Sequence, residues 1–212
     1  MTKNETAPSL PALEDPGDLE RLRAERRLDP PPGEDFWVFG YGSLMWHPGF
    51  PHLEVIAGRI YGYSRRFCIY SHIYRGTPER PGLVFGLDSG GSCRGLAYRV
   101  PAGEAEAVLD YLYDREMATG IYFPRWVPVR TERDKIQALT FVVDPSHWQY
   151  TGHLATAEVA RLILQGRGNR GTCYEYLENT VRHLSALGLQ DRRLEHLLRE
   201  VEACRCAGPA IE

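Results

Sequence analysis

Short apolar runs rich in aromatic and β-branched residues recur between residues 36 and 143, and they constrain the fold more than any other feature of the sequence. Runs of this length and composition are typical of buried β-strands. They occupy residues 36–40, 56–70, 83–87, 96–100, 126–129 and 138–143. A turn is expected at residues 88–92, where serine and glycine dominate, and Pro128 indicates an edge or bulged strand. We therefore expect a sheet built from consecutive segments.

Amphipathic spacing predicts one helix within the strand series and three helices after it. The first covers residues 101–117, and the others cover residues 157–164, 174–187 and 192–202. Apolar residues recur three and four positions apart, as on one face of a helix. The stripes of the last three helices are most simply contacts with the sheet. Residues 166–171 (GRGNRG) predict a flexible basic connection and not a P-loop, which ends in Gly-Lys-Ser/Thr.

Composition divides the chain into a leader at residues 1–35 and a domain at residues 36–212. The leader holds six of the fifteen prolines, none of the aromatic residues, and five basic and nine acidic residues, a net charge of −4. The other 177 residues carry a net charge of +1. A segment with few large apolar groups buries too little apolar surface to offset the entropy that it loses when it becomes ordered. We expect a mobile or loosely docked, acidic and proline-rich leader with helix propensity at residues 18–28, and a globular domain after it.

Charge, hydropathy and cysteine content argue against several classes of protein. A formal charge of −3 without a basic stripe is unlike a nucleic-acid binder, and the sequence has no run of about 18 apolar residues for a membrane span. Five cysteines without a secretory signal favour a cytoplasmic location over a disulfide framework. Cys204 and Cys206 are interpreted as ordinary thiols, because the spacing of metal ligands is missing. We expect no metal, cofactor, nucleic-acid or membrane partner.

Two glycines flank Tyr41 at the end of the first strand, in the sequence Gly40-Tyr41-Gly42-Ser43-Leu44. Glycine lets a backbone turn sharply and approach a ligand closely. Successive N–H groups in such a turn form a concavity that binds anions. A tight turn whose glycines only relieve strain explains the spacing equally well, since Gly-x-Gly is a weak motif without a phosphate-binding helix after it.

Glu116 occupies an unusual place in the helix predicted at residues 101–117. It follows Leu109, Leu112 and Tyr113 by seven, four and three positions, which is the spacing of one helix face. A carboxylate on an apolar stripe is desolvated, and desolvation raises its pKa toward the range of a general base or acid at neutral pH. The alternative is a boundary glutamate that pairs with an arginine or bends out to water.

Five motifs occur in one order along residues 36–202 and together are highly specific. They are Phe39-Gly40-Tyr41-Gly42-Ser43-Leu44-Met45-Trp46, Arg65-Arg66-Phe67, Arg75-Gly76-Thr77-Pro78 with Pro81-Gly82, Tyr111-Leu112-Tyr113-Asp114-Arg115-Glu116, and Tyr176-Leu177-Glu178-Asn179-Thr180. Through these motifs the chain resembles the ChaC family of γ-glutamylcyclotransferases, which act on glutathione. Cys68 departs from the pattern, since relatives often have an aromatic residue after Arg-Arg-Phe, and the leader is an addition to it.

The resemblance implies a mixed α/β fold of the γ-glutamylcyclotransferase type, with a small β-barrel or sheet and helices around one pocket. It implies that Glu116 is the catalytic residue. Arg75 is a weaker candidate for binding the glycine carboxylate of the substrate, since a guanidinium fork suits a carboxylate. Tyr176 is a candidate for lining the pocket through its hydroxyl, with a core aromatic as the alternative. The loop that holds the γ-glutamyl group maps onto Tyr41, Gly42, Ser43 and Leu44.

The implied reaction cleaves glutathione into 5-oxoproline and cysteinylglycine, as a carbon–nitrogen lyase of the amidine-lyase type. The γ-glutamyl α-amine attacks its own side-chain carbonyl, so the enzyme supplies positioning and a base, the role expected of Glu116. No metal, cofactor or enzyme nucleophile is required, and Ser43 is not expected to be one. Two alternatives stay open: a cyclotransferase for another γ-glutamyl donor, and a non-catalytic small-ligand regulatory module. The oligomeric state is left open.

Overall fold

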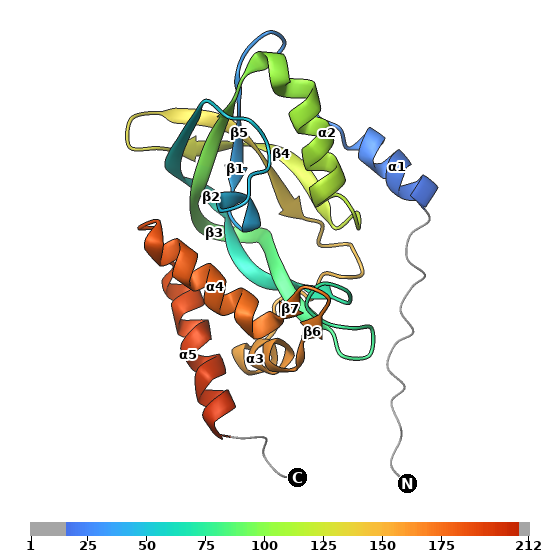
Figure 1. Cartoon of the computed structure of the whole chain (residues 1–212), viewed down its shortest axis with the longest axis vertical. Helices are drawn as coiled ribbons and strands as arrows, with labels where there is room; N and C mark the ends of the chain where they lie inside the picture. The colour runs from blue at the N-terminus through green and yellow to red at the C-terminus, as the bar shows by residue number, and fades with distance from the viewer. Residues whose placement is uncertain (1–15, 208–212) are drawn as a thin grey trace.

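Five strands form a closed barrel at the centre of the computed structural model, which describes residues 16–207 (Figure 1). The order around the barrel is β1-β3-β2-β4-β5, and β1 closes it by pairing in parallel with β5. The other neighbouring strands are antiparallel. The expectation of a mixed α/β fold with a small barrel is confirmed. The strands are β1 (Phe36–Gly40), β2 (Glu54–Ser71), β3 (Gly82–Val100), β4 (Tyr122–Arg130) and β5 (Lys135–Val143).

One apolar cluster takes side chains from every strand of the barrel. Successive residues on a strand point to opposite faces, so alternate members of the aromatic and β-branched runs meet on the same face. Burying a phenylalanine, isoleucine, leucine or valine side chain stabilises the fold by about 1.5–3 kcal/mol. Fully buried members of the cluster, one from each strand, are Phe39, Ile60, Leu87, Val129 and Ala138.

β3 is one continuous strand where the sequence predicted two short strands and a turn. The turn expected at residues 88–92 is instead a bulge: Gly90 and Gly91, with φ angles of 88° and 80°, lie opposite Gly62 of β2, whose φ is 85°. Positive φ favours glycine, and an extra residue bends a strand and increases its twist. The prediction of a turn is therefore wrong, because glycines that suit a turn also suit a bulge in the wall of a barrel.

β4 is paired along its whole length on one side. All nine of its residues pair with β5, whereas its described pairing with β2 is limited to Arg59 with Arg130. Proline cannot donate a hydrogen bond to a neighbouring strand, so it suits a strand with a largely free side. Pro128 lies in such a strand, but the expected edge position is wrong, because β2 and β5 flank β4 in the closed barrel.

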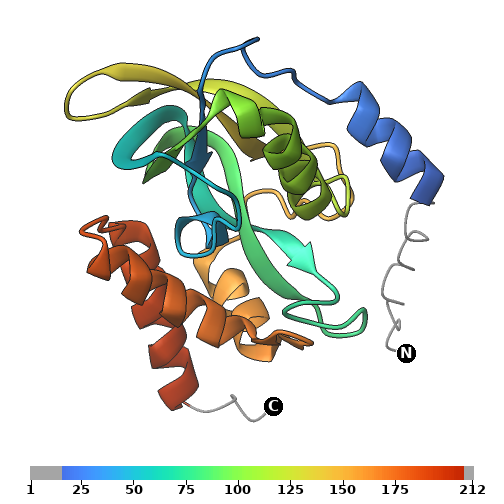
Figure 2. The same cartoon turned by 45° about the horizontal axis from the view of Figure 1, so that its top comes forward.

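The predicted helices are present on two sides of the barrel (Figures 1 and 2). α2 (Ala105–Glu116) follows the short 3-10 helix η2 (Ala102–Glu104) and packs on the strands through its apolar stripe. α3 (Thr156–Gln165), α4 (Cys173–Ala186) and α5 (Arg192–Ala207) pack together on the side away from α2. The two groups of helices leave the turn after β1 between them.

The connection at residues 166–171 is an ordered hairpin and not the flexible segment that was expected. It contains β6 (Arg167–Gly168) and β7 (Gly171–Thr172). A Cβ at Gly168 would lie 2.4 Å from the carbonyl oxygen of Ile73, so the hairpin packs directly on the backbone of the loop after β2. The N–H of Asn169 also donates to that carbonyl at 2.9 Å. Tertiary contact overrides the local flexibility that glycine suggests.

α1 (Pro16–Glu25) lies beside α2 in both views (Figures 1 and 2), close to the helix expected at residues 18–28. The residues after α1 continue this contact: the N–H of Leu28 donates to the hydroxyl of Tyr113 at 2.7 Å. Residues 1–15 of the predicted mobile leader lie outside the described residues, as do residues 208–212.

Candidate active site

The turn after β1 holds four of the predicted site residues and ends in the 3-10 helix η1 (Ser43–Met45). The N–H of Met45 donates to the carbonyl of Gly42 at 2.9 Å and closes the turn. A Cβ at Gly40 would lie 3.0 Å from the Cβ of Leu44, whereas a Cβ at Gly42 would meet no atom within 4 Å. The turn is therefore tightly packed at Gly40 and open beside Gly42.

Arg65 fixes this turn to the rest of the fold. Its Nε donates to the carbonyl of Tyr41, and its Nη2 donates to the carbonyl of Arg94 at 2.8 Å. Its Nη1 lies 2.8 Å from Oδ2 of Asp191, just before α5. The Arg65 side chain is 1% exposed, and a guanidinium at such depth is stable because its donors have partners. The pair of Arg65 and Asp191 thus joins β2, the turn and the start of α5.

Glu116 is the last residue of α2, and its side chain is 17% exposed. Burial raises the pKa of this carboxyl group, while the charge and hydrogen bond of Arg115 act in the opposite direction with smaller effect. Oε1 of Glu116 lies 3.1 Å from Nε of Arg115. The sequence left two interpretations of Glu116 open, a desolvated carboxylate and a glutamate paired with an arginine. The structure combines them, because the carboxylate is desolvated and also has Arg115 beside it.

Arg115 links Glu116 to the turn after β1. Its Nη2 donates to Oγ of Ser43 at 2.9 Å, and its Nη1 donates to the carbonyl of His47 at 2.6 Å and to the hydroxyl of Tyr111 at 2.8 Å. The sequence predicted no role for Arg115, because it lies off the apolar stripe of its helix. Its position next to Glu116 was the available signal.

Three tyrosines lie near enough to Glu116 for its charge to raise their pKa values: Tyr41, Tyr122 and Tyr176. The hydroxyl of Tyr122 donates to the carbonyl of Phe85 at 2.8 Å and is hydrogen-bonded to Tyr41. Burial, followed by the neighbouring acidic groups, raises the pKa of Tyr41 and Tyr122 well above the ordinary value. These phenols are therefore protonated donors at neutral pH. Tyr122 precedes the apolar run that predicted its strand, so the sequence did not indicate it.

Arg75 lies against Tyr176, another of the predicted residues. Its guanidinium carbon is 4.8 Å from the centre of the Tyr176 ring. Its Nη1 donates to the carbonyls of Arg170 and Thr172 in the β6–β7 hairpin. A Cβ at Gly82 would lie 2.0 Å from the Arg75 carbonyl oxygen, so backbone packing also fixes the loop. The structure thus places Arg75 at the edge of the tyrosine cluster, with part of its guanidinium used to bind the hairpin.

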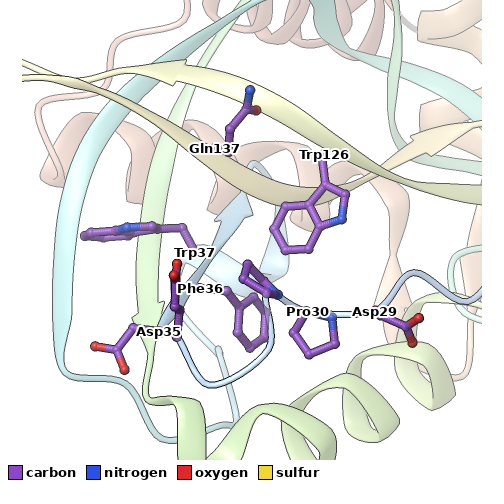
Figure 3. A pocket seen from close by; sticks show the side chains of 9 residues that line it. Asp29, Pro30, Asp35, Phe36, Trp37, Trp126 and Gln137 are labelled. Atoms are coloured by element: carbon purple, nitrogen blue, oxygen red, sulfur yellow. The ribbon is translucent and has the colours of Figure 1, made fainter.

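A hollow of about 590 Å³ lies away from these residues, between the linker after α1 and the barrel (Figure 3). Aromatic and acidic side chains line it, among them Trp37, Trp126 and Asp35. Asp35 is already paired, with Oδ2 2.9 Å from Nη1 of Arg99. None of the predicted site residues lines this hollow. The candidate site is therefore the cluster around Glu116 and not the hollow.

The described residues contain no cluster of side chains that could serve as the ligands of a metal ion. No group of three His, Cys, Asp or Glu side chains there lies close enough to hold a metal ion. No helix in the same part of the chain is long and apolar enough to cross a membrane. All five cysteines are free, and Cys204 and Cys206 are the two exposed ones.

The fold matches solved structures of γ-glutamyl cyclotransferases. Two crystal structures of the γ-glutamyl cyclotransferase specific to glutathione from yeast match with TM-scores of 0.72 and 0.70. The first is 24% identical in sequence, and the match covers 80% of this chain and 96% of that chain. The barrel and its helices therefore define this protein as a member of the γ-glutamylcyclotransferase fold class.

Sequence comparison narrows the class to a family. Residues 36–204 match the family of ChaC-like proteins. The glutathione-specific γ-glutamylcyclotransferase of Escherichia coli (strain K12) is 38% identical over 167 residues, which cover 78% of this chain and 72% of the relative. Glutathione-specific γ-glutamylcyclotransferase 1 of Homo sapiens is 35% identical over 172 residues, which cover 79% and 77%. The chain belongs to the ChaC-like family.

Proposed function

We propose that this protein is a glutathione-specific γ-glutamylcyclotransferase, a lyase that converts glutathione into 5-oxoproline and cysteinylglycine. The position of Glu116 carries the proposal: a desolvated carboxylate at the end of α2 is tied through Arg115 to the turn after β1. The names of relatives at 35–38% identity support glutathione as the substrate.

The reaction needs positioning and proton transfer. The α-amine nitrogen of the γ-glutamyl group bonds to its own side-chain carbonyl carbon, and the bond from that carbon to the nitrogen of cysteinylglycine breaks. Protons leave the attacking nitrogen and are returned to the departing nitrogen, so the reaction is balanced without another reactant. Since both reacting groups belong to one molecule, the protein has to hold the glutamyl chain in the geometry for attack.

Glu116 is suited to carry these protons. The attacking amine is mostly protonated at neutral pH and becomes a nucleophile only after it loses a proton. Burial raises the pKa of Glu116, which brings its affinity for a proton closer to that of the amine. Glu116 accepts the proton and then returns it to the departing nitrogen, acting first as base and then as acid.

The turn of Tyr41, Gly42, Ser43 and Leu44 holds the γ-glutamyl group. The free space beside Gly42 lets the substrate approach the backbone. N–H groups at the start of a helix have no acceptor within the helix. Those at the start of η1 are placed to donate to the carboxylate of the γ-glutamyl group or to the oxyanion that develops on its side-chain carbonyl. At the other end of the substrate, Tyr176 lines the pocket and Nη2 of Arg75 faces the glycine carboxylate.

A comparison of γ-glutamyl donors tests this function. The purified protein is incubated with reduced glutathione, oxidised glutathione and γ-glutamyl dipeptides, and 5-oxoproline is measured by mass spectrometry. We expect reduced glutathione to be preferred by about tenfold or more over the other donors. A greater yield from another donor would favour the alternative cyclotransferase. The absence of product from every donor would favour a non-catalytic ligand-binding module.

A cytoplasmic location fits this function. The substrate is a thiol that is kept reduced in the cytoplasm, and all five cysteines of the protein are free. We propose this location together with the activity.

A further inference from the structure

Residues 117–121 connect α2 to β4 and so join two residues of the site, Glu116 and Tyr122. The segment is an irregular bend in which Gly120 has a φ of 71°. Irregular backbone lacks the regular hydrogen bonds of a helix or strand, so its polar groups need partners from other parts of the fold. The position of Glu116 therefore depends on what holds this segment.

Two arginines from the N-terminal part of the chain bind the segment. The Nε of Arg23 donates to the carbonyl of Met117 at 3.2 Å. The Nη1 of Arg26 donates to the carbonyls of Gly120 and Tyr122 at 2.9 and 3.0 Å. These bonds hold both ends of the segment, and α1 accordingly lies beside α2 in both views (Figures 1 and 2).

Arg26 makes the stronger of these two contacts. Its Nη2 lies 2.9 Å from Oδ2 of Asp144, and its guanidinium carbon is 3.6 Å from the centre of the Phe123 ring. Asp144 holds the same segment, since its N–H donates to the carbonyl of Ile121 at 2.8 Å. The Arg26 and Asp144 side chains are 16% and 7% exposed. Ion-pair hydrogen bonds that are this well shielded from water are stronger than those on an open surface.

The backbone around Arg26 is fixed by α2 itself. The hydroxyl of Tyr113 donates to the carbonyl of Arg26 at 3.1 Å and accepts the N–H of Leu28 at 2.7 Å. Tyr113 is buried in the core beneath α2. The neighbouring Arg27 reaches carboxylates that are mostly exposed, and such pairs contribute little. Arg26 is thus presented to the segment from a rigid support.

We propose that Arg26 is a positioning residue for the reaction, which holds residues 117–122 so that the Glu116 carboxylate stays aligned with the turn after β1. The inference rests on the proposed function. The match to the ChaC-like family begins at residue 36, so this contact comes from a part of the chain outside the match. A base displaced by about 1 Å costs up to about 100-fold in rate.

The test compares Arg26→Gln with the matched control Arg21→Gln in the full chain. Arg21 lies in α1 and pairs with Asp18 at 3.4 Å on the exposed surface. Each variant is assayed for kcat and KM with glutathione, for thermal unfolding, and for hydrogen exchange of the amides of residues 117–122. We expect Arg26→Gln to lower kcat about tenfold with little change in KM, and to speed exchange in the segment. The control is expected to match the wild-type protein.

Two further variants keep the test decisive if Arg26→Gln does not fold. Arg26→Lys retains the ion pair with Asp144 and cannot bond both carbonyls in the same way, so kcat should fall between the wild-type and Arg26→Gln values. Asp144→Asn should lower kcat in the same direction. If these variants lower the melting temperature and leave kcat unchanged, the contact is a structural tether and the proposal is wrong. A wild-type protein that makes no 5-oxoproline contradicts the proposed function instead.

Discussion

The Nη2 of Arg115 donates to the Oγ of Ser43 at 2.9 Å, and this bond joins the end of α2 to the turn after β1. The same guanidinium lies beside Glu116, with Nε 3.1 Å from Oε1. One cation therefore fixes the turn that is proposed to bind the substrate and partly neutralises the carboxylate that is proposed to accept its proton.

Arg115→Met removes this cation and keeps a side chain of similar length. Because Arg115 opposes the larger effect of burial on Glu116, the pKa of Glu116 should rise further in the variant. We expect the acid limb of the pH profile of kcat/KM to move to higher pH, with kcat/KM at pH 6 about tenfold lower. Arg115→Lys keeps the charge and should leave the limb near its wild-type position. An unmoved limb in Arg115→Met would show that Glu116 does not control it.

Glu116→Gln should change how stability depends on pH. The pKa of Glu116 is raised above its ordinary value by burial, so the fold favours the protonated form. This stabilisation is complete below the ordinary pKa of a glutamate and is lost as the pH rises through the raised pKa. A tenfold difference in proton affinity between the folded and unfolded states corresponds to about 1.4 kcal/mol. Glutamine carries no charge and avoids this loss. Urea unfolding at pH 8 should find the variant at least as stable as wild type, and the difference should shrink toward pH 4.

Asp191→Asn should destabilise the fold through Arg65. The buried guanidinium of Arg65 would lose its ionised partner, and breaking a buried ion pair costs about 3 kcal/mol. The control is Glu200→Gln in α5, because Glu200 and His196 form an exposed pair at 4.0 Å and such pairs are worth about 0.5 kcal/mol. Chemical unfolding measures both variants. Equal losses of stability would mean that the Arg65 pair is no stronger than a surface contact.

The five cysteines should divide into two groups toward a thiol reagent. Burial raises the pKa of Cys68 and Cys173 to about 12, and Cys93 is also buried. These thiols stay protonated and shielded at neutral pH, whereas Cys204 and Cys206 are exposed. Brief alkylation of the native protein with N-ethylmaleimide, followed by mass spectrometry, should find two modified residues and unchanged activity. Rapid modification of Cys68 would contradict the burial described for it.

The sequence predicted the parts of the fold whose signals are local. The helix stripe that contains Leu109, Leu112 and Tyr113 is buried as expected, because hydrophobic periodicity reports directly on the face that meets the core. The same periodicity marked Glu116 as a carboxylate on that face. The turn predicted at residues 88–92 was wrong, because the positive φ angles of Gly90 and Gly91 occur both in turns and in β-bulges.

The parts of the site that the sequence did not predict are contacts between distant residues. Arg115 and Ser43 are 72 positions apart, and Arg65 and Asp191 are 126 positions apart. Such a pair produces no periodic pattern and no characteristic spacing in the sequence, because each partner is an ordinary charged or polar residue in its own segment. Tyr122 follows Glu116 by only six positions, but its hydroxyl is held by a distant residue, Phe85, which lies 37 positions before it.

The most direct test of the role proposed for Glu116 is the rate at which Glu116→Gln forms 5-oxoproline from glutathione. Glutamine keeps the shape of the side chain and removes the base, so kcat should fall by about 10²–10⁴ while the circular dichroism spectrum stays that of the wild-type protein. The control is Glu104→Gln, at an exposed position just before α2, and its kcat should equal the wild-type value. A folded Glu116→Gln protein with near wild-type kcat would contradict the assignment of Glu116 as the general base.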